Sequence, residues 1–264
     1  MTHSHAEIRA LLQLHGISPS RALGQNFVGD ANTVRRIARL AEVAAGDRVV
    51  EVGPGLGSLS LALQETGAAL TVVEKDRFLV PILEQMLHGV RVVHADALEV
   101  DWRDLLGEDD WVLVANLPYN VATPLVLQVL ERAPMVRRLL VMVQKEVGER
   151  FAARPRTKAY GAVSVKTAWF ANASVAGKVP PTVFVPKPNV ESALVLLDRH
   201  AEAGDEAERA RVFHLIDAGF ATRRKMLRNN IDVDDACFDA AGVASTARAE
   251  ELDLDAWRRL AQCR

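Results

Sequence analysis

Glu51-Val52-Gly53-Pro54-Gly55-Leu56-Gly57-Ser58 is the stretch of sequence that decides the fold. It joins a β-branched run to a segment with helical periodicity. Glycines at such a turn let a ligand approach the backbone closely, which is typical of the first βα unit of a nucleotide-binding α/β sheet. The spacing is Gly-x-Gly-x-Gly, and Pro54 removes a backbone donor that a pyrophosphate would need. The turn therefore suits a nucleoside without phosphates better than it suits NAD.

Outward from this turn, short β-branched runs alternate with helical patterns, which predicts βαβ units and a parallel sheet. The predicted strands are Arg48–Val52, Leu70–Glu74, Arg91–His94, Trp111–Ala115 and Leu139–Gln144. The predicted helices are Asn32–Val43, with Asp30 as its N-cap, and then Ser58–Glu65, Phe78–Leu87, Trp102–Leu106 and Ala122–Arg132. The fold class is α/β, with a doubly wound sheet.

The pattern changes after Glu146. Helices are predicted at Lys145–Ala153 and Ala162–Phe170, and the apolar run Ser192–Leu197 would add a final antiparallel strand. Beyond the acidic stretch His200–Glu208 the pattern is helical throughout. We therefore expect two domains, a ligand-binding domain in residues 1–200 and a small helical domain in residues 201–264.

Composition narrows the class of protein. The chain has 264 residues, 49% of them hydrophobic, and contains no apolar stretch of the ~20 residues that span a bilayer. The first fifteen residues lack the apolar centre of a secretory signal, so a cytoplasmic protein is expected. Cys237 and Cys263 show no metal-ligand spacing, which favours reduced thiols over a bridge, and neither zinc nor iron is expected.

Charge is distributed unevenly along the chain. Residues 1–132 carry 11 Lys or Arg against 17 Asp or Glu, whereas residues 133–190 carry 10 Lys or Arg against Glu146 and Glu149 alone. A basic middle in an otherwise acidic chain is expected if a polyanion contacts one face, although an unevenly charged solvated surface would look the same.

Polar residues end three successive predicted strands. Glu74 follows the glycines by about 20 residues, where a carboxylate can accept bonds from ribose hydroxyls. Asp96 follows the next strand and Asn116 the one after it. Because the carboxyl ends of parallel strands meet at one edge, we expect all three side chains to face a single crevice.

Asn116-Leu117-Pro118-Tyr119 suits chemistry on the exocyclic amine of a flat base. A side-chain amide oxygen and a backbone carbonyl can accept the amine's hydrogens, and an aromatic ring can stack on the base. An ordinary turn followed by a packed tyrosine is the plain alternative for these four residues.

The ordered motifs resemble the ribosomal RNA adenine dimethylases, a family of class I S-adenosylmethionine-dependent methyltransferases. The resemblance is carried by Leu23–Phe27, Glu51–Gly57, Asn116–Asn120 and Val183–Pro188, and the branch it is most similar to acts on small-subunit (16S) RNA. It implies a Rossmann-like, mostly parallel seven-stranded sheet and S-adenosylmethionine as methyl donor. It also implies dimethylation of two adjacent adenines late in small-subunit biogenesis, by a protein that we expect to be monomeric.

The resemblance further implies roles for individual residues. Those expected to bind the cofactor are Gln25, Asn26, Val28, Gly53, Gly55, Glu74, Asp96, Ala97 and Asn116. Those expected to act on the target base are Asn116, Leu117, Pro118 and Tyr119, with Phe184 as a second aromatic wall. Methyl transfer would be direct, with no general base needed before attack, because the amine loses its proton as the new bond forms.

RNA contacts are predicted at three places. The first is a basic loop with four positive charges, interrupted by Pro155 and Thr157. The second is Lys187, which follows the Phe-x-Pro element. The third is Phe220–Asn230, where four more positive charges would contact phosphates or solvate an exposed helix. The predicted RNA-binding residues are Arg150, Arg154, Arg156, Lys158, Lys187, Arg223, Arg224, Lys225 and Arg228. No role is assigned to residues 232–264 beyond packing.

Three other functions stay open at this point. A large-subunit (23S) RNA dimethylase of the macrolide-resistance type would share most of these motifs. A dehydrogenase is disfavoured by Pro54. A mainly non-catalytic factor for small-subunit assembly would need the RNA contacts without the chemistry.

Overall fold

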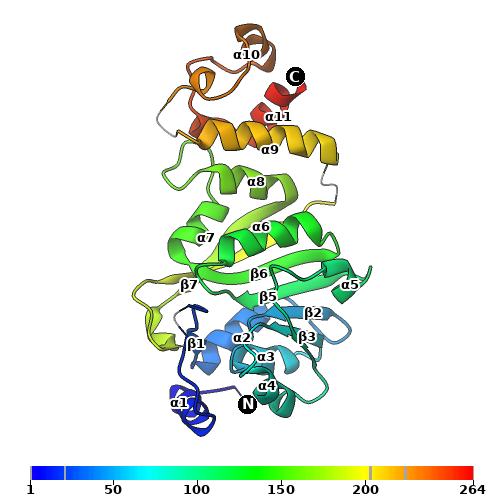
Figure 1. Ribbon diagram of the computed structural model, residues 1–264, viewed down its shortest axis with the longest axis vertical. Helices are drawn as coiled ribbons and strands as arrows, with labels where there is room; N and C mark the ends of the chain where they lie inside the picture. The colour runs from blue at the N-terminus through cyan, green and yellow to red at the C-terminus, as the bar shows by residue number, and fades with distance from the viewer. Residues whose placement is uncertain (1, 21, 202–203, 223–224, 264) are drawn as a thin grey trace. The chain divides into compact units, whose positions relative to one another are not determined.

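A seven-stranded sheet forms the centre of the computed structural model, which describes residues 2–20, 22–201, 204–222 and 225–263 (Figure 1). The strand order is β4-β3-β2-β5-β6-β9-β7. The strands are β2 (Arg48–Val52), β3 (Ala69–Glu74), β4 (Arg91–His94), β5 (Trp111–Asn116), β6 (Val136–Gln144), β7 (Ala171–Val179) and β9 (Ser192–Arg199). All five predicted strands are confirmed, and so is the final antiparallel one, since β9 pairs antiparallel with β6.

The topology places a ligand crevice between β2 and β5. These two strands pair in parallel, but the chain runs outward from β2 through β3 to β4, and outward from β5 to β6 on the other side. Loops that follow β2 and β5 therefore leave in opposite directions and open a gap at the carboxyl edge of the sheet. The glycine turn follows β2, and the Asn-Leu-Pro-Tyr motif begins at the last residue of β5.

The helices between the strands occur where periodicity predicts them. Their bounds are α2 (Ala31–Leu40), α3 (Ser58–Gln64), α4 (Val80–Met86), α5 (Trp102–Leu106) and α6 (Ala122–Arg132). The Asp30 carboxylate accepts a bond from the Thr33 N–H at 2.6 Å, which confirms it as the N-cap of α2. Apolar faces of α2 and α3 pack on β2 and β3 in one core cluster, where Val34, Ile37 and Leu63 are fully buried.

Two features near the N-terminus were not predicted. Helix α1 (His5–Leu14) buries Ile8 and Leu12 in a small cluster with Phe27, Leu56 and Ile82. A two-stranded antiparallel ribbon pairs β1 (Phe27–Val28) with β8 (Phe184–Val185). The ribbon fixes the N-terminal segment against the passage that holds the Phe-x-Pro-x-Pro element.

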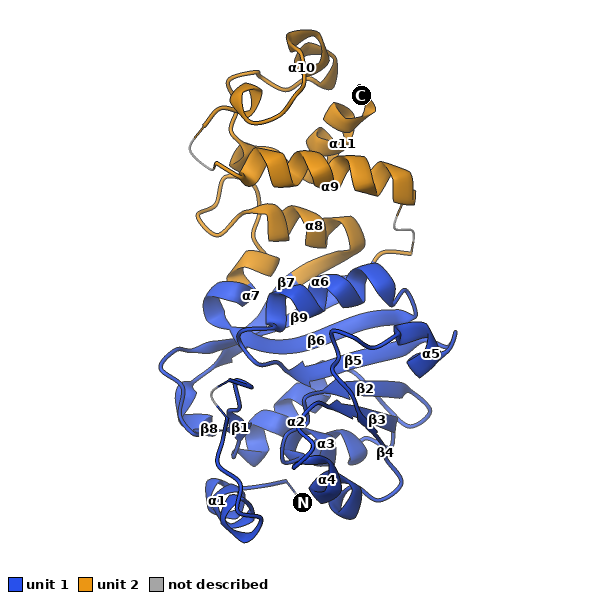
Figure 2. Cartoon of the chain, in the orientation of Figure 1, with its two compact units in different colours: residues 1–148, 174–199 blue, residues 149–173, 200–264 orange. Residues whose placement is uncertain are grey.

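The chain divides into two compact units (Figure 2). The first unit comprises residues 1–148 and 174–199, and the second comprises residues 149–173 and 200–264. The sequence pattern predicts a single domain boundary at residue 200. The compact units also assign residues 149–173 to the helical part, because α8 (Ala162–Phe170) packs with α9 (Glu206–Phe220), and α7 (Lys145–Phe151) crosses the division.

The second unit has its own core around Trp257, which is fully buried. Trp257 belongs to α11 (Leu254–Gln262), which packs on α9. The two helices approach closely at Gly219, where a Cβ would lie 2.4 Å from the Trp257 ring. A residue with a side chain could not occupy that position without a shift of the helices.

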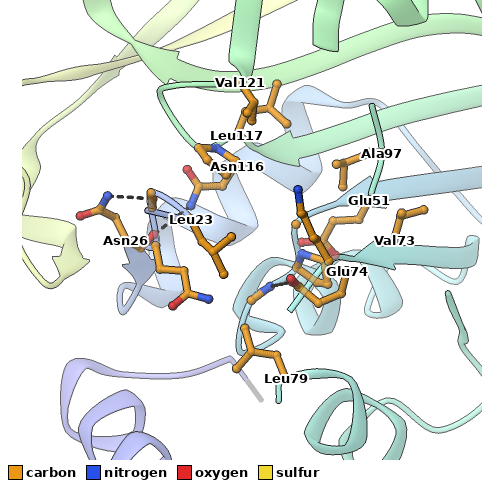
Figure 3. Close-up of a pocket in the computed structure, with 18 of the residues that line it drawn as sticks. Leu23, Asn26, Glu51, Val73, Glu74, Leu79, Ala97, Asn116, Leu117 and Val121 are labelled. Carbon is orange, nitrogen blue, oxygen red and sulfur yellow. Dashed lines mark hydrogen bonds between the residues drawn. The ribbon is translucent and has the colours of Figure 1, made fainter. Parts of the chain in front are cut away.

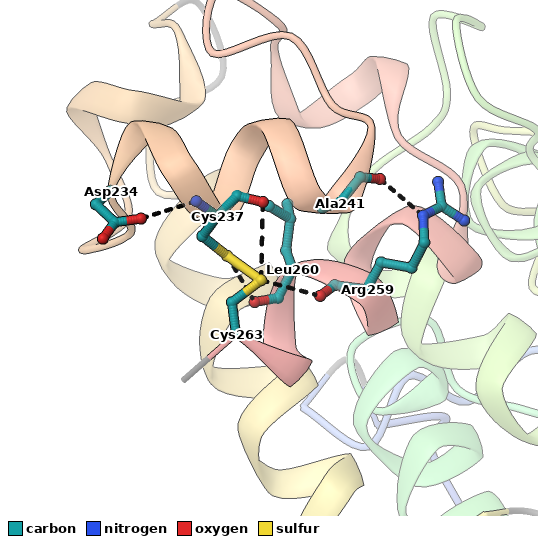
Figure 4. The surroundings of a disulfide bond; sticks show 6 residues. All are labelled: Asp234, Cys237, Ala241, Arg259, Leu260 and Cys263. Atoms are coloured by element: carbon teal, nitrogen blue, oxygen red, sulfur yellow. Dashed lines mark hydrogen bonds between the residues drawn. A yellow bond between two sulfur atoms is a disulfide. The ribbon is translucent and has the colours of Figure 1, made fainter.

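The expectation of reduced thiols is wrong. Cys237 on α10 (Asp235–Ala241) and Cys263 after α11 form a disulfide with their Cα atoms 5.7 Å apart (Figure 4). The two cysteines are 26 positions apart in the sequence, and Arg259 donates to the Ala241 carbonyl at 2.8 Å beside the bridge. Sequence spacing gave no indication of this pairing because helix packing creates it.

Among the described residues, no helix is both long and apolar enough to cross a membrane.

Candidate active site

A cavity opens at the carboxyl edge of the sheet, and its lining lies entirely within the first unit (Figure 3). The residues expected to bind cofactor all line it, namely Gln25, Asn26, Val28, Gly53, Gly55, Glu74, Asp96, Ala97 and Asn116. Leu117, Pro118 and Tyr119 also line it. The polar residues that end successive strands thus do face a single crevice.

The glycine turn forms the floor of the cavity through its backbone. Gly53, Gly55 and Gly57 have φ values of 66°, 60° and 77°, a backbone conformation that residues other than glycine rarely adopt. A Cβ on Gly55 would lie 2.8 Å from the Phe27 ring. The turn therefore excludes side chains at the point where a ligand meets the backbone.

Two buried carboxyl groups line the cavity beside this turn. Glu74 at the end of β3 accepts bonds from the Gly55 N–H at 3.1 Å and the Asp76 N–H at 2.8 Å. Burial raises the pKa of Glu74, and these two bonds oppose the rise. Burial raises the pKa of Glu51 to about 8, although the Ser60 hydroxyl donates to it at 2.5 Å. The oxygens of Glu74 suit ribose hydroxyls as hydrogen-bond acceptors.

Asp96 also lines the cavity. One oxygen pairs with the Lys75 ammonium at 2.5 Å, and the other accepts the Leu98 N–H at 3.0 Å. The bond from Lys75 lowers the pKa of Asp96 below its usual range, so this carboxylate is ionised at neutral pH. Ala97 follows it with a small side chain, as a flat ring in this position would require.

Asn116 is held by the N-terminal segment, which we define as residues 22–28. Its Nδ2 donates to the backbone carbonyl oxygen of Asn26 at 3.1 Å. The bond fixes the amide plane and identifies the remaining Oδ1 as the acceptor that the side chain offers to the cavity. Asn116 is also the last residue of β5, so its backbone is held by the sheet.

The backbone of the motif continues from strand into helix. The Leu117 N–H donates to the Met142 carbonyl of β6, and the Pro118 carbonyl accepts bonds from the N–H groups of Val121 and Ala122. Both lone pairs of the Pro118 carbonyl are therefore used in starting α6. This leaves the Leu117 carbonyl as the backbone acceptor better placed to serve a ligand.

The Tyr119 ring lines the cavity, and its hydroxyl is held by a hydrogen bond. The hydroxyl lies 2.9 Å from that of Ser192, which is fully buried at the start of β9. Burial raises the pKa of Tyr119, with the Ser192 bond opposing, so the phenol is neutral at physiological pH. A neutral, fixed ring suits stacking rather than proton transfer.

The N-terminal segment joins the two sides of the cavity. Gln25 donates to Asp76 at 2.7 Å on the glycine-turn side, and Asn120 donates to the Ala22 carbonyl at 3.4 Å on the motif side. Gly24, at φ 64°, fits against Pro118, where a Cβ would lie 2.9 Å from the Pro118 Cβ. Residues 22–28 thus line the cavity as a strap.

Phe184 lies outside the cavity lining. Its side chain is 2% exposed and belongs to the main core cluster, and its backbone pairs with Val28 in the small ribbon. The structure does not place it beside Tyr119, so its role as a second aromatic wall stays a prediction.

The predicted RNA-binding residues are distributed over both units. Lys187 lies in the first unit and is exposed. The members of the set that lie in the second unit are also exposed, namely Arg150, Arg154, Arg156, Lys158, Lys225 and Arg228. Arg223 and Arg224 lie outside the described residues. The RNA role of the whole set stays a prediction.

Three residues that shape the site were not predicted from the sequence. Lys75 pairs with Asp96, Asp76 receives the Gln25 amide, and Ser192 holds the Tyr119 hydroxyl. Lys75 and Asp76 follow Glu74 directly, so their position at a strand end was an available indication. Ser192 lies 73 residues from Tyr119, and only the β6–β9 pairing brings it there.

No group of His, Cys, Asp or Glu in the described part of the chain could hold a metal ion.

Comparison with known proteins identifies relatives along nearly the whole chain. The family model for ribosomal RNA adenine dimethylase matches residues 18–263. A protein of Leifsonia xyli subsp. xyli named "Ribosomal RNA small subunit methyltransferase A" is 50% identical over 272 residues, covering 97% of this chain and 96% of its own. A protein of Bifidobacterium adolescentis with the same name is 47% identical, covering 97% and 92%.

Solved structures resemble the fold as well. The 23S rRNA methyltransferase ErmE superposes with a TM-score of 0.70 at 27% identity, covering 90% of this chain and 98% of its own. A dimethyladenosine transferase from Plasmodium falciparum gives a TM-score of 0.74 at 20% identity, covering 89% and 95%. The class I methyltransferase fold expected from the sequence is confirmed.

Proposed function

The chain belongs to the ribosomal RNA adenine dimethylase family, and from this premise we propose that it dimethylates the N6 amines of two adjacent adenines in a 16S RNA hairpin. S-adenosylmethionine is the methyl donor, and the reaction takes place late in small-subunit biogenesis. The near-complete match to relatives named for the small subunit supports this choice of RNA.

The residues of the cavity fit S-adenosylmethionine. Glycines with positive φ allow the methionine part to lie on the backbone, and the buried Glu74 offers acceptors for the two ribose hydroxyls. Asp96 and Ala97 suit the amine and the face of the adenine ring. When bound, the cofactor supplies an electrophilic methyl group on a sulfonium.

Asn116 and Leu117 would accept the two hydrogens of the target amine. The Nδ2 bond from Asn116 to Asn26 sets Oδ1 as the free acceptor, and the Pro118 carbonyl is already engaged by α6. Two acceptors hold the amine so that its lone pair leaves conjugation with the ring and points at the methyl group. The fixed amide of Asn116 is the observation that carries the proposal.

Tyr119 would hold the target base by stacking, a contact worth about 1–3 kcal/mol per base. The base must leave its helix to reach the cavity, as in other enzymes that act on bases. No residue of the site is needed as a general base before attack, because the amine becomes acidic only as the N–C bond forms. Catalysis is therefore positioning and hydrogen bonding.

The RNA would be held by the basic residues of both units, and the cavity is complete within one chain, which supports action as a monomer on the particle. A protein that works on assembling ribosomal subunits in a bacterium acts in the cytoplasm.

Methyl incorporation into separated ribosomal subunits tests the proposal. We expect labelled methyl groups in adenines of small-subunit RNA from precursor particles lacking the modification. Incorporation into large-subunit RNA alone would favour the activity named for ErmE. Binding to precursor particles with no incorporation into either subunit would favour a non-catalytic assembly factor.

A further inference from the structure

The hydroxyl of Ser192 lies 2.9 Å from that of Tyr119, and this contact joins two sequence motifs that are far apart in the chain. Ser192 follows the Phe-x-Pro-x-Pro element and starts β9, whereas Tyr119 ends the Asn-Leu-Pro-Tyr motif. Resting on the function proposed above, we infer that Ser192 is a positioning residue that sets the plane of the Tyr119 ring for the target base.

Burial makes the contact a fixed one. The Ser192 side chain is 0% exposed, so its hydroxyl depends on a partner within the protein. Leaving such a group without a partner is costly, which ties the phenol to this position. Tyr119 is in turn held at its backbone, because the preceding Pro118 carbonyl accepts two N–H groups at the start of α6. The ring is thus fixed at both ends.

One strand sets the spacing between the amine acceptor and the ring anchor. Met142 of β6 stands opposite Asn116 on β5, and Gln144 of β6 stands opposite Ser192 on β9. Met142 and Gln144 are two residues apart, a separation of roughly 6.5 Å along a strand. The sheet therefore fixes Asn116 and the Ser192 anchor in a common frame, and Tyr119 lies between them.

The protonation state of the Tyr119 phenol agrees with a hydroxyl that holds the ring in place. Because burial raises the pKa of the Tyr119 phenol, the hydroxyl keeps its proton at neutral pH and can donate to Ser192 Oγ or accept from it. The bond is made at the edge of the ring, so it does not itself occupy a ring face that stacking would use.

The first test is a double-mutant cycle with Tyr119→Phe, Ser192→Ala and the double variant, measured as single-turnover methyl transfer to small-subunit precursor particles. We expect each single variant to slow transfer about tenfold, which is within the range of a lost stacking contact. The double variant should be no slower than either single variant. Affinity for S-adenosylhomocysteine should stay within about twofold of wild type, since neither hydroxyl contacts the cofactor region.

Tyr160→Phe is the matched control. Its hydroxyl donates to the Leu252 carbonyl at 2.7 Å in the second unit and is buried, but it lies in no proposed site. This variant should lower the unfolding temperature and leave the transfer rate of folded protein unchanged. Multiplicative losses in the cycle, a wild-type rate for Ser192→Ala, or an equal fall in cofactor affinity would each overturn the inference.

The contact can also be observed without turnover. The chain contains only two tyrosines, so Tyr119→Phe assigns their resonances in a protein labelled at tyrosine. We expect a slowly exchanging Tyr119 hydroxyl proton in the wild type and its loss in Ser192→Ala, and an unchanged Tyr119 signal in Ser192→Ala would contradict the contact. If wild type methylates no adenine, the proposed function fails, and this measurement alone still decides whether Ser192 fixes the ring.

Discussion

Asn116 donates its side-chain amide to the backbone carbonyl oxygen of Asn26, at 3.1 Å across 90 residues of sequence. The bond fixes the orientation of the amide whose oxygen the chemistry needs. It also makes the N-terminal segment part of the active site, because the segment lines the cavity and holds the first residue of the Asn-Leu-Pro-Tyr motif. The N-terminal segment therefore affects both the entry of the cofactor and the orientation of the Asn116 amide.

Gly24→Ala should disturb the position of this segment. Gly24 has φ 64°, and a Cβ there would lie 2.9 Å from Pro118 Cβ and 3.1 Å from Asn120 Oδ1. The segment would have to move away from the motif, so we expect at least a tenfold loss of methyl transfer, equivalent to about 1.4 kcal/mol.

Gly16→Ala is the matched control for that change. Gly16 has nearly the same φ of 62°, but a Cβ there meets nothing within 4 Å. Both variants carry the strain of the left-handed conformation, about 1–2 kcal/mol. Equal transfer rates for the two variants would show that the approach of Gly24 to Pro118 does not matter.

Glu51→Gln should change how stability depends on pH. Burial raises the pKa of Glu51 to about 8, above its ordinary value of 4.5. The folded protein thus binds one more proton than the unfolded chain between those values, so this group stabilises the fold most below pH 4.5 and loses that contribution as pH rises through 8. Wild type should lose stability relative to Glu51→Gln from pH 5 to pH 9, measured as unfolding temperature without cofactor. Parallel curves would refute the assignment.

Arg199→Ala should destabilise the first unit. The Arg199 guanidinium donates to the carbonyl oxygens of Val129, Leu130, Ala133 and Val136, at 2.8 to 3.2 Å, and so caps α6, which follows the Asn-Leu-Pro-Tyr motif. Loss of these bonds leaves several carbonyls unsatisfied, and we expect a cost of about 2–4 kcal/mol in denaturant unfolding.

Arg137→Ala controls for simple loss of a charge. Arg137 pairs with Asp110 at 2.6 Å, and both side chains are more than half exposed. Such a pair contributes about 0–1 kcal/mol. An equal loss in the free energy of unfolding for Arg137→Ala and Arg199→Ala would show that the bonds from Arg199 to the α6 carbonyls add no stability beyond that of a surface charge.

The sheet and the crevice could be predicted because their sequence patterns are local. Arg48–Val52 reads as a buried parallel strand, and Glu74, Asp96 and Asn116 stand at strand ends that topology must bring together. Helix α1 was missed because it is short and the charged Glu7 and Arg9 flank Ile8, and β7 was missed because Gly177 and Lys178 interrupt its apolar character.

What could not be predicted depends on packing between distant segments. The disulfide of Cys237 and Cys263 arises from α10 lying against α11, and the Tyr119–Ser192 contact arises from the β6–β9 register. Phe184 stands next to a recognisable motif and is buried in the main core, so its role beside the target base stays a prediction.

The central claim is that Asn116 positions an adenine of small-subunit RNA for methylation. It is tested most directly by mass spectrometry of nucleosides from 16S RNA, in cells that lack this protein and carry either the wild type or Asn116→Ala. We predict dimethyladenosine with the wild type and its loss with Asn116→Ala, whose methylation rate should fall on the order of 100-fold while its cofactor affinity falls far less. Dimethyladenosine at the same level with both proteins, or in cells with neither, would contradict the account.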